Sequence, residues 1–409
     1  MEIRVYEDER DRPAAMRIYR EVGWVTSDEH EKAAAEIPTA GYSAVAEIDG
    51  SVESLACSAS GTLRHLTTDI SLAAVTTVAT SRVARKRALA ARLTARLLAD
   101  LAEAGTDAAV LGIFEQGYYN QLGFGNGSYE NWYSFDPSQL LVDAPPRIPV
   151  RLGPDDWEPM HANRLQRLRL HGACSLDSPG VSRAEILWSQ NGFGLGYRDE
   201  EGALTHHVWC ESKDVERGPY TVLWMAYRTK AEFMELMGLL KSLGDQVRTV
   251  KINEPPSVQL HDLVRQPFKT RQMTQRTEHE SRMTALPYWQ ARILDLASCL
   301  AGTRLTEGPL QFNLTLSDPI AKHLAPDVPW QGIAGKYIIR LGSECGCDQG
   351  RDPALPTLRA SVNAFTRLWL GVRPATSLSW TDELEGPADL LADLDAVLRL
   401  PTPHPDWEF

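Results

Sequence analysis

The feature that most constrains the fold is residues 80–114, where a basic turn leads into a helix and the helix into a strand. Leucines at positions 89, 93, 97 and 101 fall four residues apart, as on one face of a helix, and Ala104-Gly105 is a typical helix end. Residues 107–114 form a short, nearly continuous apolar run, which is typical of a strand covered on both faces. This order predicts an α/β layer.

The residues before this turn predict the rest of the layer. Residues 3–6 alternate as in a strand, and apolar residues follow at helical spacing up to Val22. Residues 42–48 alternate again and end at Asp49-Gly50, a strong hairpin signal. We expect the returning strand over residues 55–66 and another strand over residues 70–80.

The length of 409 residues exceeds what one compact core usually holds and predicts several domains. The clearest break is the proline-rich stretch 144–149. We therefore predict domains over 1–143, 144–287 and 288–409. The second should repeat a strand, helix and strand over residues 220–252, without a basic turn between the first strand and the helix.

The third predicted domain has a helix over residues 292–300, strands over 310–316 and 335–341, a helix containing Phe365 and a final helix over 388–398. The tail that follows, Pro401-Thr402-Pro403-His404-Pro405, is too rich in proline to be helical. We expect this tail to be extended and stiff enough to deliver Phe409 to a fixed place.

Composition excludes some classes of function. The formal net charge of -12 disfavours nucleic-acid binding, because phosphates select basic surfaces. No apolar run reaches the ~18 residues needed to span a bilayer, and no secretory apolar core follows Met1. We expect a cytoplasmic protein with free thiols. A lone Cys345-Gly346-Cys347 without a histidine pair does not make a zinc site, so no metal is expected.

The basic turn, Arg85-Lys86-Arg87-Ala88-Leu89, lies where cations are normally unfavourable, because a helix N-terminus carries a positive dipole end. Its unpaired N–H groups and the added cations together suit a pyrophosphate such as that of an acyl-CoA. Small residues let the backbone approach a diphosphate, although Ala88 meets this need less well than glycine. The alternative is a helix whose basic first turn is only solvated.

Tyr118 and Tyr119 follow the predicted strand 107–114 after a short turn. A phenol with a pKa near ~10, held beside a thioester, suits protonation of a departing thiolate. The alternative is that both tyrosines only fill the core.

Together these segments resemble the Eis (enhanced intracellular survival) acetyltransferases. The basic turn and then Gly117-Tyr118-Tyr119-Asn120-Gln121-Leu122-Gly123-Phe124-Gly125 are similar to that family's Arg-Arg-Arg-Gly-Leu and Gly-x-Tyr-Gly-x-Phe-Gly-Tyr-Gly. Phe365-Thr366-Arg367-Leu368-Trp369-Leu370-Gly371 and the final Glu408-Phe409 are similar to its C-terminal segments. The resemblance implies an α/β (α+β) fold with tandem GNAT-like acetyltransferase domains, the second degenerate, followed by a sterol-carrier-protein-like domain.

The resemblance also implies residue roles. Tyr119 would be the general acid and the carboxylate of Phe409 the general base. An α-carboxylate has a reference pKa near ~3.5, so desolvation would have to raise that pKa. The cofactor-binding residues would be Val78 and Thr80 at the pantetheine and Arg85, Lys86, Ala88 and Leu89 at the pyrophosphate; the substrate-binding residues would be Trp24, Asp28 and Glu408. Two positions depart from the family: Ala88 and Asn120 each replace a glycine.

The expected activity is transfer of an acetyl group from acetyl-CoA to a primary amine of a cationic small molecule, an aminoglycoside or a polyamine or lysine-like amine. Two alternatives stay open: acylation of a specialised-metabolite amine or with a longer acyl-CoA, and a non-catalytic member that binds CoA or a hydrophobic ligand. The resemblance further implies a homo-oligomer, a hexamer, with no nucleic-acid partner and no membrane span.

Overall fold

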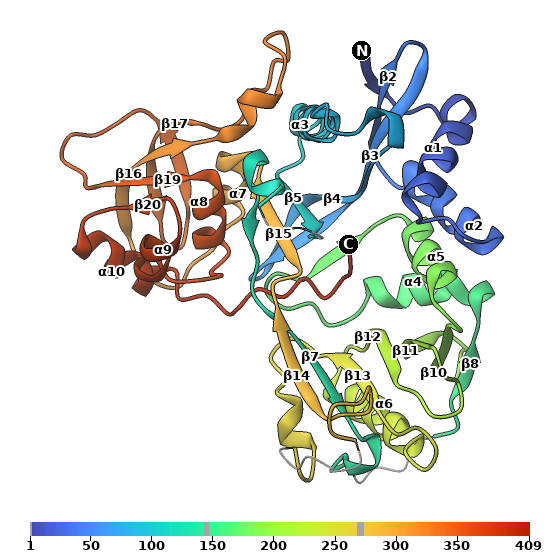
Figure 1. Ribbon diagram of the computed structural model, residues 1–409. Helices are drawn as coiled ribbons and strands as arrows, with labels where there is room; N and C mark the ends of the chain where they lie inside the picture. The colour runs from blue at the N-terminus through green and yellow to red at the C-terminus, as the bar shows by residue number, and fades with distance from the viewer. Residues whose placement is uncertain (1, 114, 116, 143–146, 268–273) are drawn as a thin grey trace. The chain divides into compact units, whose positions relative to one another are not determined.

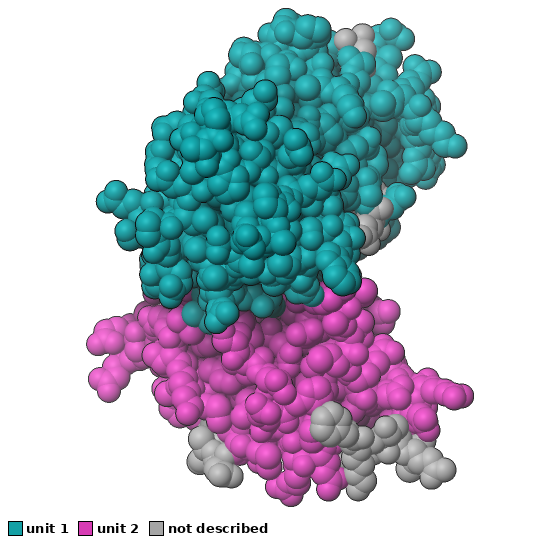
Figure 2. All heavy atoms as spheres, turned by 90° about the vertical axis from the view of Figure 1, so that its left-hand side faces the viewer, with its two compact units in different colours: residues 1–128, 170–178, 287–409 teal, residues 129–169, 179–286 magenta. Residues whose placement is uncertain are grey.

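The computed structural model describes residues 2–113, 115, 117–142, 147–267 and 274–409. Within these residues the chain forms two compact units, each coloured separately in Figure 2. Unit 1 contains residues 1–128, 170–178 and 287–409, and unit 2 contains residues 129–169 and 179–286. The three-domain division of the chain stays a prediction.

The first sheet of unit 1 combines strands from the first 126 residues with two strands from later in the chain (Figure 1). Its strand order is β1 (Glu2–Val5), β2 (Ser43–Ile48), β3 (Ser51–His65), β4 (Thr68–Thr80), β5 (Ala108–Gly112), β15 (Trp289–Ile293) and β6 (Gly125–Asn126), with β9 (Cys174–Leu176) paired to β3. Neighbours are antiparallel except β4 and β5, which are parallel. The helices of this part are α1 (Asp8–Val22), α2 (Asp28–Glu36) and α3 (Leu89–Glu103).

These elements match the expected order of strand, helix, hairpin, strands, helix and strand. Asp49 and Gly50 join β2 to β3 with φ values of 50° and 81°, as the hairpin signal predicted. The leucines of α3 face the sheet, since Leu93 and Leu97 are fully buried and share a hydrophobic cluster with Leu111 of β5. Phe114, the last residue of the expected strand 107–114, lies outside the described residues.

The helix expected over residues 292–300 is wrong in its first half. Residues 289–293 form β15, which pairs with β5 and β6 at once and is buried along its whole length. A strand covered on all sides shows no alternation, so its sequence does not separate it from a helix. The helix, α7 (Leu296–Ala301), begins after Asp295, whose side chain accepts a hydrogen bond from the Ser298 N–H.

The second sheet of unit 1 has the order β18 (Gly346–Gln349), β17 (Gly335–Leu341), β16 (Leu310–Ser317), β19 (Thr357–Ser361) and β20 (Leu384–Glu385). Helices α8 (Val362–Trp369), α9 (Ala375–Thr381) and α10 (Ala388–Val397) follow β19 in the sequence. Residues 401–409 follow without helix or strand, as their prolines predicted. In Figure 1 this tail, in dark red, ends at the mark C.

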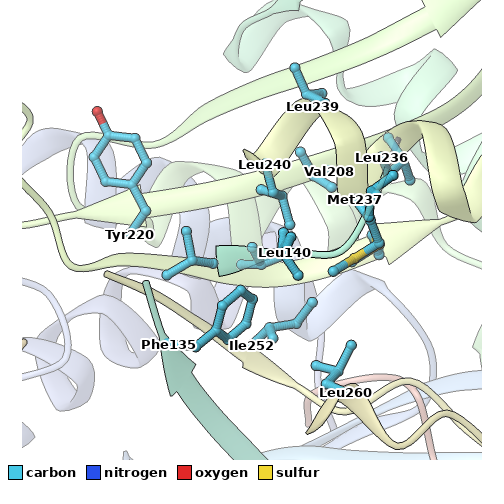
Figure 3. Packing of buried hydrophobic residues seen from close by; sticks show 14 of the residues in the cluster. Phe135, Leu140, Val208, Tyr220, Leu236, Met237, Leu239, Leu240, Ile252 and Leu260 are labelled. Carbon is cyan, nitrogen blue, oxygen red and sulfur yellow. The ribbon is translucent and has the colours of Figure 1, made fainter. Parts of the chain in front are cut away.

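Unit 2 is a sheet with the order β14 (Arg282–Leu286), β7 (Glu130–Phe135), β13 (Val250–Asn253), β12 (Tyr220–Ala226), β11 (Leu204–Ser212), β10 (Phe193–Arg198) and β8 (Val150–Leu152). Its helices are α4 (Trp157–Leu165), α5 (Pro179–Trp188) and α6 (Lys230–Ser242). Figure 3 shows leucines and Met237 of α6 in one cluster with Phe135 and Ile252 of the strands. The expected strand, helix and strand over residues 220–252 are β12, α6 and β13.

Two further properties concern the residues that the structure describes. None of their helices is long and apolar enough to cross a membrane. Cys345 and Cys347 are half-buried free thiols, and no group of three or more His, Cys, Asp or Glu side chains in the described ranges is arranged to hold a metal ion.

Candidate functional site

The central feature of unit 1 is the place where β4 continues beyond β5. The parallel register between them covers residues 72–75 of β4 and ends with Val75 opposite Leu111. β4 runs on to Thr80 while paired to β3, with Val78 opposite Ala56 and Thr80 opposite Ser54. Residues 76–80 therefore extend past this register, and a strand edge of this kind can hydrogen-bond an extended ligand as if it were an added strand.

The basic turn links the end of β4 to α3. Arg82 has a structural role. Its backbone N–H donates to the Glu21 carboxylate at 2.8 Å, and its side-chain Nε donates to the Glu21 backbone carbonyl at 3.1 Å. The next three cations, Arg85, Lys86 and Arg87, are exposed. Ala88 is also exposed, whereas Leu89 is buried. Lys86 and Ala88 both have left-handed backbones, with φ values of 61° and 55°. The turn thus brings exposed cations to the start of a helix.

The N-terminus of α3 has the properties of an anion site. Ala88 supplies no capping side chain, and no acidic residue lies in the first turn. The first α-helical hydrogen bond runs from Arg92 N–H to the Ala88 carbonyl at 3.1 Å, so the N–H groups before it have no partner along the helix. Helix α6 of unit 2, which like α3 joins two parallel strands, differs, because the Thr229 hydroxyl accepts from the Glu232 N–H at 3.2 Å. That helix end is closed by its own cap.

Tyr119 begins the 3-10 helix η3 (Tyr119–Leu122) and is 5% exposed. It belongs to a hydrophobic cluster with Val75 and Leu111, against which Val78 also packs. Its ring lies perpendicular to that of Tyr118, with centroids 5.0 Å apart. Burial, and secondarily the neighbouring Tyr118, raise the pKa of the Tyr119 phenol well above its usual value. A phenol in this state keeps its proton near pH 7.

The tail reaches the same part of the sheet. Its main chain is held by His404 N–H donating to the His171 carbonyl at 3.1 Å and by Cys174 N–H donating to the Pro405 carbonyl at 2.8 Å. The Ser128 hydroxyl donates to the Pro403 carbonyl. Trp407 is buried, Glu408 exposed and Phe409 half-buried.

The last residue of the tail contacts the end of β5. A β-carbon added to Gly112 would lie 2.5 Å from the main-chain oxygen of Phe409 and 3.4 Å from its carbonyl carbon. Sequence reasoning missed Gly112, although a glycine closing a buried strand is a signal for close approach of another backbone.

Segment 170–178, which holds the tail, is anchored on two buried histidines. His171 Nε2 lies 3.0 Å from the Leu370 carbonyl, and its Nδ1 accepts from the Leu66 N–H at 3.1 Å. His65 Nε2 lies 3.1 Å from the Trp369 carbonyl, and the His65 ring stacks on Trp369. Burial, together with the neighbouring His171, lowers the pKa of His65 to about 4. Both imidazoles are therefore neutral near pH 7.

Trp24 and Asp28, the expected amine-binding residues, lie around the start of α2. Trp24 is 41% exposed and stacks on Tyr19 with centroids 5.7 Å apart. The Tyr19 hydroxyl lies 3.1 Å from the Thr77 hydroxyl of β4, which links this corner to the strand edge. Asp28 is exposed in an acidic first helical turn. The structure thus gathers Val78 and Tyr119 in one cluster and Phe409 on β5, while Trp24 is joined to β4 through Tyr19.

Part of the sequence matches a known domain family. Residues 9–127 match the acetyltransferase (GNAT) domain family. No curated protein matches the sequence. Among solved structures, a probable N-acyltransferase from Enterococcus faecalis has a TM-score of 0.79 at 18% identity, with 100% of this chain and 99% of that chain covered.

Two other solved structures cover this whole chain. A GCN5-related N-acetyltransferase from Kribbella flavida has a TM-score of 0.73 at 18% identity over 98% of its own length. Eis1 from Mycobacterium abscessus has a TM-score of 0.76 at 17% identity over 100% of its own length. The expected likeness to the Eis fold is thereby confirmed along the full chain. The chain carries an acetyltransferase domain of the GNAT type in residues 9–127, within an Eis-like fold.

Proposed function

We propose that this chain is an acetyl-CoA-dependent N-acetyltransferase that acetylates a primary amine of a cationic small molecule, such as an aminoglycoside or a polyamine. The GNAT domain match supports the acetyl-CoA chemistry. The single observation that carries the catalytic part is the contact of Phe409 with Gly112, because it brings a carboxyl group to the end of β5.

In this proposal acetyl-CoA lies along β4 and α3. The pyrophosphate binds the open N-terminus of α3 at Ala88 and Leu89, and Arg85 and Lys86 add positive charge. The pantetheine amides bond the backbone of β4 around Val78 and Thr80, where the strand edge extends past its register with β5.

The chemistry needs one base and one acid. The Phe409 carboxylate takes a proton from the amine as its nitrogen attacks the acetyl carbonyl. A C–N bond forms, the C–S bond breaks, and Tyr119 gives its proton to the departing thiolate of CoA. The raised pKa means that the Tyr119 phenol is protonated before the reaction.

The amine pocket is proposed around Trp24, Asp28 and Glu408. An exposed indole face attracts a cation, and the carboxylates balance the remaining ammonium groups of a polyamine or aminoglycoside. The net charge of -12 supports a cationic substrate in the same direction.

The finer parts of the family resemblance remain proposals too. They are the domains over 1–143, 144–287 and 288–409, a sterol-carrier-like third domain, hexameric assembly and a cytoplasmic location.

The role of the Phe409 carboxylate as the general base is tested by comparing proteins extended at the C-terminus and at the N-terminus. A C-terminal extension converts the Phe409 carboxylate into an amide, whereas an N-terminal extension leaves it intact. We expect the C-terminally extended protein, and a variant lacking Phe409, to bind acetyl-CoA normally and to lose turnover with a panel of polyamines and aminoglycosides. Full turnover by the C-terminally extended protein would refute the carboxylate's role.

The acetyl-CoA site has a separate test. Replacing Arg85 and Lys86 by glutamate places like charge against the diphosphate and should abolish acetyl-CoA binding in calorimetry. Unchanged affinity in this double variant would remove the assignment, independently of the base.

A further inference from the structure

The turn that carries Tyr119 is held by side chains from far along the sequence. Asn363 Nδ2 donates to the Asn120 carbonyl at 2.9 Å and to the Phe124 carbonyl at 2.8 Å. Gln290 Nε2 donates to the Asn120 side-chain oxygen at 3.2 Å. Arg292 Nη1 donates to the Leu122 carbonyl. Gln290 and Arg292 belong to β15, and Asn363 lies in the first turn of α8.

Asn363 holds the turn after Tyr119 at two points. Its two acceptors, the carbonyls of Asn120 and Phe124, come one and five residues after Tyr119. The helix that bears it is capped, because the Ser361 hydroxyl accepts from the Ala364 N–H at 3.3 Å. A β-carbon at Gly125 would overlap the Asn363 carbonyl oxygen, so the absence of a side chain there lets α8 approach.

Asn120 takes part in the same bracing. Its Nδ2 donates to the Phe124 carbonyl at 3.0 Å, while its side-chain oxygen accepts from Gln290. Glycine, which the Eis pattern has at this position, offers neither bond. The departure at Asn120 therefore adds a side chain that closes the turn on itself and ties it to β15.

Arg292, which bonds the Leu122 carbonyl of the turn, is itself held rigidly in place. Its side chain and that of Asp318 are each 0% exposed, and they pair at 2.5 Å. Asp318 is fixed in turn by the N–H groups of Ile320 and Ile333 at 3.1 and 2.9 Å. A buried ion pair with these further hydrogen bonds resists displacement, because moving either partner leaves an uncompensated charge.

We propose that Asn363, supported by Gln290 and Arg292, is a positioning residue that fixes the phenol of Tyr119 for proton donation. The inference rests on the proposed role of Tyr119 as the acid. Asn363 acts through the carbonyls of Asn120 and Phe124, both of which follow Tyr119 in the sequence. Small displacements of a positioned catalytic group are costly, up to about 10²-fold for roughly 1 Å.

The main test is Asn363→Ala, with Asn313→Ala as the matched control. Asn313 Nδ2 makes the same kind of double donation, to the carbonyls of Asp352 and Leu355 at 2.8 and 2.9 Å, but braces a loop of the second sheet. We expect Asn363→Ala to lower kcat about 10-fold or more with the KM for acetyl-CoA unchanged. Asn313→Ala should keep kcat within about twofold.

Asn363→Asp separates shape from hydrogen-bond donation. Aspartate has the same outline but presents oxygen to two carbonyl acceptors, so its kcat should fall at least as far as that of Asn363→Ala. Wild-type kcat in either Asn363 variant would overturn the proposal. A loss of kcat in Asn313→Ala equal to that in Asn363→Ala would also overturn it, since general loosening of unit 1 would then explain both.

A double variant ties the effect to Tyr119. Adding Asn363→Ala to Tyr119→Phe should cause no further loss of kcat, because the group that Asn363 positions is already absent. Equal losses in both backgrounds would overturn the positioning proposal alone. Full activity of Tyr119→Phe by itself would instead overturn the acid assignment, and the positioning proposal with it.

Discussion

Gly112 and Phe409 lie in van der Waals contact, so closely that a single added methyl group at Gly112 would meet the main-chain oxygen of Phe409 at 2.5 Å. The three atoms nearest to such a β-carbon all belong to Phe409. The end of a central strand is therefore shaped around the last residue of the tail.

The first prediction uses this contact. Gly112→Ala should displace Phe409 and lower kcat by at least about 10-fold while acetyl-CoA binding is kept, because α3 and the basic turn are untouched. Gly346→Ala is the control: its β-carbon would lie 3.6 Å from the nearest atom, an ordinary contact. Steady-state kinetics and calorimetry on both variants decide the matter, and a fully active Gly112→Ala would contradict the prediction.

The second prediction separates the two adjacent tyrosines. Tyr119→Phe should lower kcat about 10²-fold with unchanged acetyl-CoA affinity, whereas Tyr118→Phe should do little. Because burial raises the pKa of Tyr119, kcat of the wild type should show no loss from tyrosine ionisation up to about pH 10. Similar kinetics for the two variants would show that the assignment to Tyr119 is wrong.

The third prediction concerns Ala88. Its left-handed backbone costs a non-glycine residue about 1–2 kcal/mol, and Ala88→Gly regains this while losing about 0.4–1 kcal/mol through a more flexible unfolded chain. Stability should change little, and acetyl-CoA should bind more tightly without the methyl group. Lys86→Gly relieves the same kind of backbone but removes a cation, so it should bind acetyl-CoA more weakly. Calorimetry giving both variants the same affinity change would refute this reading.

The fourth prediction is a pH dependence of stability. The pKa of His65 is about 4 in the folded chain and about 6.5 when unfolded, so between these values the unfolded chain binds more protons. The contribution of His65 to the free energy of unfolding is fully present above pH 6.5 and decreases by about 3 kcal/mol as the pH drops to 4.

His65→Gln tests this pH dependence, since glutamine is still able to donate to the Trp369 carbonyl but does not titrate. Urea unfolding should show a smaller loss of stability from pH 7 to pH 5 in the variant. The loss should not vanish, because burial also lowers the pKa values of His171 and His207. If the free energy of unfolding fell equally with pH in the wild type and in His65→Gln, His65 would be excluded as a source of the pH dependence.

Elements formed by residues close together in the sequence could be predicted from the sequence. Pairings between strands far apart in the sequence could not. Strand β4, the basic turn and α3 follow from periodicity and turn chemistry over residues 70–103. The placement of β15 between β5 and β6 does not, because a strand buried on both faces has no alternating pattern and its partners lie far away in the sequence.

The candidate site divides in the same way. Tyr119 and the cations of the turn belong to recognisable sequence motifs. The roles of Gly112 and Asn363 become visible only in the structure, which places Phe409 against Gly112 and the Tyr119 turn against Asn363. Asn363 precedes the segment that resembles the Eis pattern and carries no signal of its own. Its two acceptors are main-chain carbonyls, which every residue has.

The insertion of β15 has a consequence for synthesis on the ribosome. Until residues 289–293 emerge, the edge of β5 that β15 covers is open, and an uncovered edge strand invites pairing with other chains. The acetyltransferase domain at the start of the chain thus completes its sheet only after unit 2 has been translated. Nascent chains of this protein are therefore expected to depend on chaperones late in elongation, and its first domain is a poor candidate for transplantation into other enzymes.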